Sequence, residues 1–249
     1  INSIYKELNI ESKRLVLDSD LQLNFNSKIE LDSVSFSYDG STNIIENLYL
    51  TINKGEAIGI VGESGSGKST LIDLIMGLII PTNGEIKVDN MPIHKNLTSW
   101  QKKIGYVPQN TFLLDKTILE NIAFGEDLDQ IDINRVNECL IKAQLSDLIE
   151  SLNDGLQTKV GERGLNISGG QKQRVSIARA IYNDAETFLF DEPTSSLDTN
   201  NVDNFISTIE NLNNLGKTII IVTHSMQQAS RVSDKTSFLF LPFVYTVIK

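Results

Sequence analysis

The chain has 249 residues, and 40% of them are hydrophobic, which is enough for one large α/β domain around a buried core. It carries 32 acidic residues against 22 basic ones, and this formal charge of −10 argues against a broad nucleic-acid-binding face because phosphate backbones repel acidic surfaces. No stretch approaches the roughly 18 to 20 apolar residues that span a bilayer, and the first residues lack a signal-peptide pattern. The single cysteine, Cys139, fits a reducing compartment.

The first part of the chain predicts a linker followed by strands. Residues 1–27 are polar with scattered apolar positions, and we expect an N-terminal linker before a domain that starts at residue 28. Because the chain opens with Ile1 rather than methionine, we also expect further sequence upstream. Near alternation of apolar and polar residues at 29–36 and 48–52 predicts antiparallel strands with one face in water.

The next elements alternate between strand and helix. An apolar run at 57–61 leads through glycines into apolar residues at helical spacing, which predicts a strand, a loop and a helix. Short strands are expected near Ile86 and at 104–107. Residues 117–152 have helical spacing within an expected helical subdomain of about 113–183.

Two later apolar runs predict the centre of a sheet. Residues 188–190 and 219–222 have few polar interruptions, as in parallel strands that helices cover on both faces. The predicted fold class is therefore α/β, with an antiparallel β edge and a helical subdomain.

A phosphate-binding loop follows the strand at 57–61. The matching residues are Gly62, Glu63, Ser64, Gly65, Ser66, Gly67, Lys68 and Ser69. The glycines let backbone N–H groups form an anion nest at the positive end of the next helix, and this predicts a P-loop NTPase core. Lys68 is expected to reach the β- and γ-phosphates of ATP or GTP, Ser69 to ligate Mg²⁺, and Thr70 to contact the nucleotide. The alternative is a glycine-rich turn that binds nothing.

Two acids end the apolar strand at 187–190. Carboxylates at the carboxyl edge of a parallel sheet lie where ligands bind, so Asp191 is predicted in the magnesium shell. Glu192 is predicted to act as the general base that polarises the attacking water. By itself, an Asp-Glu pair after a strand is common and usually marks a strand end that enters an exposed loop. Together with the phosphate loop, the pair indicates a functional site.

A second glycine motif comprises Ser168, Gly169, Gly170 and Gln171 at the start of an amphipathic segment. Ser168 and Gln171 fit a capping box, which is a purely structural device. Two glycines in the first turn weaken a helix by about 1 kcal/mol each relative to alanine. Close approach to an anionic ligand at the helix N-terminus would explain them.

In this order the motifs resemble the nucleotide-binding domains of the ATP-binding-cassette (ABC) family over roughly residues 28–235. The resemblance implies that Ser168 to Gln171 contact the γ-phosphate held by a second copy, so that two chains sandwich two ATP molecules head to tail. It also implies that Gln109 touches Mg²⁺ and senses a membrane domain. Asp198, in the segment from Ser196, would cross the dimer interface.

The resemblance adds two further sites and a set of roles. His224 matches a switch histidine at the γ-phosphate, and Tyr38 matches the aromatic that stacks on adenine, although a tyrosine that ends a strand is often just partly buried. The implied catalytic residues are Lys68, Gln109, Glu192 and His224. The implied metal ligands are Ser69, Gln109 and Asp191, with ATP and Mg²⁺ as the bound species.

The branch of the family is less uniform. Residues 117–125 and 159–164 resemble exporters, in which the N-terminal linker comes from a fused membrane domain, whereas residues 222–234 look like the ATPase subunits of phosphate importers. We expect ATP hydrolysis that powers export of a lipid, polysaccharide, peptide or drug-like substrate. The alternatives are a phosphate-type importer subunit and a non-transport ABC ATPase.

The expected partners are a membrane-spanning domain, fused upstream or separate, and a second nucleotide-binding domain, with no nucleic acid. The expected location is the cytoplasmic face of the cell (inner) membrane. Residues 235–249 depart from the family because they contain no glycine and are largely apolar. We expect this atypical tail to be poorly accommodated or to mediate association.

Overall fold

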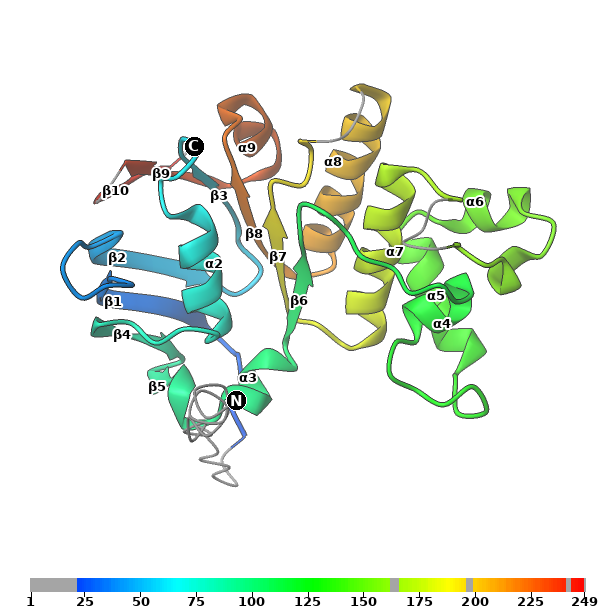
Figure 1. Cartoon of the computed structure of the whole chain (residues 1–249), viewed down its shortest axis with the longest axis horizontal. Coiled ribbons are helices and arrows are strands. Elements are labelled where there is room, and N and C mark those ends of the chain that lie inside the picture. The colour runs from blue at the N-terminus through cyan, green and yellow to red at the C-terminus, as the bar shows by residue number, and fades with distance from the viewer. Residues whose placement is uncertain (1–21, 162–165, 196–198, 241–242, 249) are drawn as a thin grey trace, which may run out of the picture.

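The computed structural model describes residues 22–161, 166–195, 199–240 and 243–248, which fold around two sheets (Figure 1). The strands are β1 (Lys28–Phe36), β2 (Ile45–Asn53), β3 (Ala57–Val61), β4 (Asn83–Val88), β5 (Met91–Pro92), β6 (Ile104–Val107), β7 (Thr187–Asp191), β8 (Thr218–Thr223), β9 (Lys235–Phe240) and β10 (Phe243–Ile248). The helices are α2 (Lys68–Met76), α3 (Leu97–Gln101), α4 (Ile118–Ile122), α5 (Ile133–Lys142), α6 (Ser146–Ser151), α7 (Gly169–Tyr182), α8 (Thr199–Asn214) and α9 (Met226–Val232), with the 3-10 turns η1 (Ile93–Lys95) and η2 (Gly155–Gln157). The predicted α/β class is confirmed.

The first sheet is antiparallel, with strand order β2-β1-β4-β5. In β2 the apolar side chains of Leu48, Leu50 and Ile52 are buried while Tyr49 and Thr51 between them are exposed. This is the one-sided burial that the alternating sequence predicted. Figure 1 shows α2 between this sheet and the second one.

The second sheet has the order β10-β9-β3-β8-β7-β6, and all its neighbouring pairs are parallel except β10 with β9. In β8, Ile219 and Ile221 join the core under α7 and α8, whereas Ile220 and Val222 join the core under α2. A strand buried on both faces favours apolar residues at successive positions, which explains the apolar run at 219–222. The carboxyl ends of β3, β7 and β8 therefore lie side by side.

The helical region forms one end of the molecule (Figure 1). The sequence at 117–152 divides into the short helices α4, α5 and α6, and α7 joins them to the central sheet. Arg135 of α5 lies 2.7 Å from Asp184 just after α7, an ion pair that fastens this end to the chain leading into β7.

Part of the expected N-terminal linker packs into the domain. Leu23 and Phe25 are each 1% exposed, and the Phe25 ring lies edge-on to Trp100 at 6.2 Å between ring centroids. The domain therefore includes residues upstream of 28. Residues 1–21 of the expected linker lie outside the described residues.

The C-terminal segment corrects one expectation. β9 extends the central sheet beside β3, and its residues Ser237 and Leu239 are 0% and 1% exposed. The prediction that the tail is poorly accommodated is therefore wrong for residues 235–239, because β9 supplies both backbone pairing and core side chains. β10 then pairs antiparallel with β9 at the edge of the sheet.

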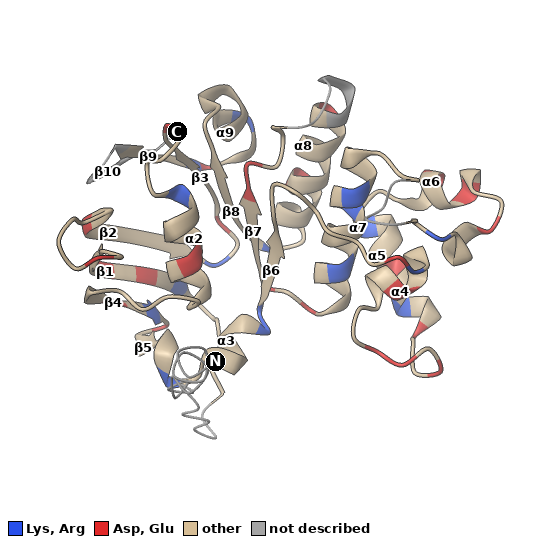
Figure 2. Ribbon diagram, viewed as in Figure 1, with Lys and Arg blue, Asp and Glu red and all other residues tan. Residues whose placement is uncertain are grey.

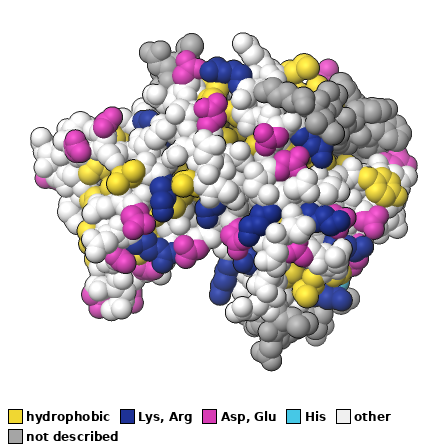
Figure 3. All heavy atoms as spheres, turned by 180° about the vertical axis from the view of Figure 1, so that it is seen from behind, with side chains coloured by type: hydrophobic (Ala, Val, Ile, Leu, Met, Phe, Trp, Pro, Cys, Tyr) yellow, Lys and Arg dark blue, Asp and Glu magenta, His cyan; other side chains and the backbone are white. Residues whose placement is uncertain are grey.

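Within the described ranges, no helix combines the length and the apolar character needed to cross a membrane. Seen from behind, acidic and basic side chains are interspersed over the surface (Figure 3).

Candidate functional site

The predicted phosphate loop connects β3 to α2, so the expected order of strand, loop and helix is confirmed. Gly67 caps α2 with a φ of 83°, in the left-handed region that favours glycine. A Cβ atom on Gly62 would lie 2.4 Å from Ser66 Oγ and 2.8 Å from the carbonyl oxygen of Leu239 in β9. The loop thus needs glycine at these two positions, and its backbone amides surround the positive end of α2.

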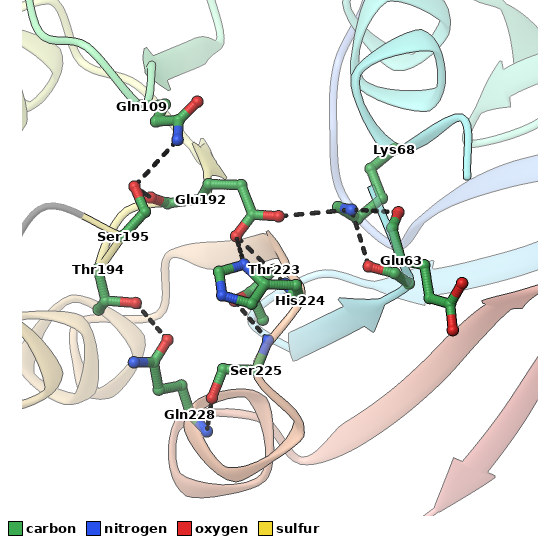
Figure 4. Close-up of polar contacts among 11 residues, drawn as sticks. Glu63, Lys68, Gln109, Glu192, Thr194, Ser195, Thr223, His224, Ser225 and Gln228 are labelled. Carbon is green, nitrogen blue, oxygen red and sulfur yellow. Dashed lines mark hydrogen bonds and ion pairs between the residues drawn. The ribbon is translucent and has the colours of Figure 1, made fainter. Parts of the chain in front are cut away.

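Lys68 lies at the centre of the loop and is only 7% exposed. Its Nζ donates to the carbonyl oxygens of Gly62 and Glu63, each at 2.8 Å, and lies 3.4 Å from Glu192 Oε1 (Figure 4). A buried ammonium group requires such partners, because burying an unpaired charge is costly. The carbonyl groups of the phosphate loop therefore hold the Lys68 side chain in place.

Glu192 joins the phosphate loop to the end of β8. Its Oε2 accepts from the backbone N–H of His224 at 3.2 Å and lies 2.7 Å from His224 Nδ1 (Figure 4). The backbone of Glu192 has a φ of 44°, which for a residue other than glycine costs on the order of 1–3 kcal/mol. Such a conformation persists where the surroundings fix it, and it is frequent at functional sites.

Asp191 precedes Glu192 at the carboxyl end of β7. Burial raises the pKa of the Asp191 carboxyl, and the neighbouring Glu192 carboxylate raises it further. Tyr106 of β6 donates its hydroxyl to Asp191 Oδ2 at 3.4 Å, and burial, followed by the charge of Asp191, raises the pKa of Tyr106 to about 12. Tyr106 is thus a neutral donor beside this carboxylate, a role that the sequence analysis missed.

These groups line one cavity of about 420 Å³. Its phosphate-loop residues are Ser64, Gly65, Gly67, Lys68, Ser69 and Thr70, and its other polar residues are Gln109, Asp191, Glu192 and His224. Polar residues 160 positions apart in sequence, Ser64 and His224, thus meet at the carboxyl edge of the central sheet. Ile44, which the sequence analysis did not single out, also lines the cavity.

The cavity fits a nucleotide phosphate with a magnesium ion. The buried hydroxyl of Ser66 has no hydrogen-bond partner among the described residues, and the buried lysine and the glycine cradle suit an anion. The described residues contain no cluster of three or more His, Cys, Asp or Glu side chains able to hold a metal by themselves. Mg²⁺ needs no such cluster, because it is commonly bound by one or two protein groups together with substrate phosphates and water.

Tyr38 lies beside the loop but not in the cavity wall. Its hydroxyl is 3.4 Å from Thr70 Oγ1, and its ring packs edge-on against Phe36 with centroids 4.8 Å apart. The side chain is 64% exposed, which leaves the ring available to a base next to the phosphate site. Its adenine-stacking role stays a prediction.

The second glycine motif lies elsewhere. Ser168 caps α7, and both halves of the capping box with Gln171 are formed, as predicted. Ser168 and Gly169 are exposed and contribute nothing to the wall of the phosphate cavity. Figure 2 shows basic residues along α7, which are Lys172, Arg174 and Arg179. The expected interface residues Ser196 and Asp198 lie outside the described residues.

The segment after Glu192 is bonded by residues whose roles the sequence analysis did not foresee. Gln109 Nε2 donates to Ser195 Oγ at 3.1 Å, and the Ser195 hydroxyl donates to the Glu192 carbonyl oxygen at 2.9 Å. Gln173 of α7 and Gln228 of α9 contact the two residues between them. No local pattern marks these contacts, because each joins elements that are distant in sequence.

The sequence profile of the family described as "ABC transporter" matches residues 45–195, well over half of the chain. The chain belongs to the ABC transporter family. The match begins in β2 and includes the phosphate loop, the N-terminus of α7 and the pair Asp191 and Glu192. The resemblance inferred from the motifs is therefore confirmed.

The similar proteins include a transporter and a flippase. The chain is 42% identical over 202 residues to "Iron-sulfur clusters transporter ATM1, mitochondrial" of Kluyveromyces lactis, an alignment that covers 80% of this chain and 28% of the relative. It is 36% identical over 207 residues to "ATP-dependent lipid A-core flippase" of Cupriavidus metallidurans. This alignment covers 81% of this chain and 35% of the relative. The chain thus spans about a third of the length of these relatives.

The fold is that of an exporter's nucleotide-binding domain. A solved structure of a bacterial Atm1-family ABC exporter with ATP bound matches with a TM-score of 0.78 and 36% identity, over 88% of this chain and 38% of that one. The predicted combination of a P-loop core, an antiparallel β subdomain and a helical subdomain is confirmed.

Proposed function

We propose that this chain binds ATP with Mg²⁺ and hydrolyses it to power export across a membrane. The observation that carries the proposal is the contact between buried Lys68 of the phosphate loop and Glu192, beside Asp191, in one cavity at the N-terminus of α2. A cation and an anion nest for phosphate, a carboxylate for the metal and a second carboxylate for water together suit phosphoryl transfer to water.

In this proposal the cavity residues divide into binding and chemical roles. The phosphate-loop amides and Lys68 hold the β- and γ-phosphates, and Ser69, Gln109 and Asp191 hold Mg²⁺ directly or through water. When bound, Mg²⁺ neutralises charge that develops on the transferred phosphoryl group. Tyr38 supports the adenine ring.

Glu192 takes the role of general base. Its carboxylate is 14% exposed at the side chain and already lies between Lys68 and His224, so it can accept a proton from a water held in the cavity. His224 is 64% exposed at its side chain and borders the same cavity, where it can donate to the phosphate or orient the water. A phosphate at Lys68 would take over the ammonium contact that Glu192 makes in the free chain.

A second nucleotide-binding domain completes the proposed site. The N-terminus of α7 carries bare glycines, faces solvent and lies outside the phosphate cavity of its own chain. Helix N-termini bind phosphate, so this exposed terminus is suited to the nucleotide held by another copy. The proposal is a head-to-tail dimer with two ATP molecules at the interface.

The proposed membrane partner has a suitable surface. A hollow of about 420 Å³ between the central sheet and the helical end is lined by Tyr106, Phe112, Leu114, Phe124 and Arg179, among others. Phe112 and Phe124 are 59% and 48% exposed. Exposed apolar groups gathered in one hollow are typical of protein interaction sites. We propose that the membrane-spanning domain docks here.

The similar proteins favour export over the importer-like interpretation of residues 222–234. The named relatives are a mitochondrial iron–sulfur cluster transporter and a bacterial lipid flippase, and these activities belong to those proteins. For this chain we propose a membrane-attached location, with the cytoplasmic face of the cell membrane as the expected side.

The test is phosphate release from ATP by the 249-residue chain. The parent should release phosphate with Mg²⁺ present and lose this activity on chelation of the metal. Glu192→Gln keeps the shape of the side chain but cannot accept the proton, so turnover should fall by about a hundredfold or more while ATP binding survives.

Size-exclusion chromatography with ATP provides a second readout. Because ATP persists in the Glu192→Gln variant, this variant should accumulate as an ATP-dependent dimer. Turnover at the parent rate would overturn the assignment of the base. A variant that is inactive yet monomeric at saturating ATP would contradict dimer formation by this chain alone.

A further inference from the structure

Three glutamines from three separate elements bond the three residues that follow Glu192. The Gln173 side-chain amide, on α7, donates to the carbonyl oxygen of Pro193. The Thr194 hydroxyl donates to Gln228 Oε1, on α9. Gln109, just after β6, donates to Ser195 Oγ at 3.1 Å. Figure 4 shows the Gln109 and Gln228 contacts on either side of this segment.

The contacts lie partly in the protein interior. Gln173 is 3% exposed and Thr194 is 8% exposed, so both hydrogen bonds form where water cannot easily replace them. Gln173 Oε1 is buried and makes no hydrogen bond with the described residues. An amide kept in the interior with half of its hydrogen-bonding capacity unused costs stability, which indicates a role other than packing.

Residues 193–195 directly follow Glu192, so contacts to them act on the backbone beside this carboxylate. Glu192 has the left-handed backbone conformation described above, and residues held in such conformations require support from their surroundings. Its backbone N–H is fixed to the carbonyl oxygen of Val222 at 2.9 Å. On its other side, the three glutamines hold Pro193, Thr194 and Ser195.

We propose that Gln173 and Gln228 are positioning residues for Glu192, and that with Gln109 they form a three-glutamine clamp on residues 193–195. The clamp fixes the backbone that directs the Glu192 carboxylate towards Lys68 and the cavity. This inference rests on the proposed role of Glu192 in ATP hydrolysis. It gives a function to Gln228, which lies in the importer-like stretch at 222–234.

The clamp also links the site to two other elements. Gln173 lies one helical turn after Gly170 of the second glycine motif, so a shift of the α7 N-terminus would pull on Pro193. Gln228 lies in the first turn of α9, four residues after His224, and its backbone N–H donates to Ser225 Oγ at the cap of this helix. Residues 193–195, next to the proposed base, are thereby connected both to the N-terminus of α7 and to the segment that carries His224.

The test replaces each amide by a side chain of similar shape that cannot make the bond. Gln173→Met and Gln228→Met should each lower kcat for ATP by about tenfold or more, because displacements of about 1 Å are costly in catalysis. KM should stay within about twofold, since the phosphate loop is untouched. Gln227→Met, on the exposed face of α9, is the matched control and should behave as the parent.

Two further variants address the Gln228 contact without changing the buried Gln173. Thr194→Val removes the donor with little change of shape and should lower kcat as Gln228→Met does. Thr194→Ser keeps the hydroxyl, and Gln228→Glu keeps an acceptor, so each should retain more activity than its apolar counterpart. If Thr194→Val and Gln228→Met both matched the parent kcat, the clamp would have no positioning role.

A combination with Glu192→Gln separates positioning from a structural effect. A clamp that acts through Glu192 has little left to lose once the carboxylate is gone, so adding Gln173→Met or Gln228→Met should lower the residual rate by less than about twofold. The full additional loss, or a fall in kcat that follows the melting temperature, would overturn the proposal. Absence of phosphate release by the parent would instead count against the proposed ATPase function.

Discussion

Two helix N-termini in this molecule carry glycines and face opposite situations. The N-terminus of α2 is enclosed by its own chain, with Lys68 buried and Asp191, Glu192 and His224 in the wall of the same cavity. The N-terminus of α7 is capped by Ser168 but exposes Gly169 to solvent. The N-terminus of α2 belongs to a phosphate site whose other groups come from the same chain. The N-terminus of α7 is suited to a phosphate that another chain holds.

The difference shows how one sequence device can serve two purposes. Both termini present unpaired backbone N–H groups and the positive end of a helix dipole. At α2 the fold adds a cation and two carboxylates, the groups on which the proposed binding and hydrolysis of ATP depend. At α7 the helix has Lys172 in its first turn and no acidic residue, which favours binding of an anion. Substitutions at the two termini should therefore separate ATP binding from turnover.

The largest expected effect is at α2. Lys68→Ala removes the buried cation of the phosphate site, so ATP binding should be lost and turnover should fall by at least about a hundredfold. Isothermal titration calorimetry with ATP and a phosphate-release assay measure the two quantities. Lys142→Ala, at an exposed ion pair of α5, is the control. Retained ATP binding in Lys68→Ala would mean that the loop amides suffice to bind the phosphates and that Lys68 contributes little to the affinity.

The second prediction concerns the support behind the α2 terminus. Leu239 of β9 is 1% exposed, and its carbonyl oxygen lies against Gly62. Leu239→Ala should destabilise the chain by about 2–5 kcal/mol, as large-to-small changes in a core do. Urea unfolding gives this free energy, and deletion of residues 238–249 should lower stability further. Unchanged stability and a changed oligomer size after the deletion would return the tail to the role of an association segment.

A third substitution tests the α7 terminus. Gly169→Asp places a carboxylate where the partner's phosphate is proposed to bind, so turnover should fall by roughly a hundredfold through loss of transition-state stabilisation. ATP binding to the single chain should change little, and folding stability should not fall, because an acid suits a helix N-terminus. Gly169→Asn has nearly the same size without the charge and should lose less. Equal losses in both variants would point to sterics instead of charge.

The smallest expected effect is at the rim of the phosphate site. Tyr38→Ala should weaken ATP binding by about 1–3 kcal/mol, the contribution of one aromatic ring stacked on a base. Tyr38→Phe removes only the hydroxyl that reaches Thr70 and should largely preserve affinity. Titration calorimetry distinguishes these outcomes. Equal affinity in the alanine variant would show that the ring is only a neighbour of the loop.

The sequence alone was sufficient for features that depend on local order. The strand, glycine loop and helix around Lys68, the capping box of Ser168 and Gln171, and the apolar run at 219–222 in β8 all follow from the spacing of residues close to one another in the chain. Such features are fixed by backbone conformation, capping and the periodicity of burial, which act over a few residues. The family could therefore be inferred before the fold was known.

The tertiary structure decided what distant segments do together. Only packing brought Leu23 and Phe25 into the core, placed β9 beside β3, and set Gln173 and Gln228 against the residues after Glu192. Each of these contacts joins segments that lie far apart in sequence or depends on which face of an element is covered. Local patterns contain no information on such pairings, because burial and hydrogen bonding at these positions depend on the whole sheet being assembled.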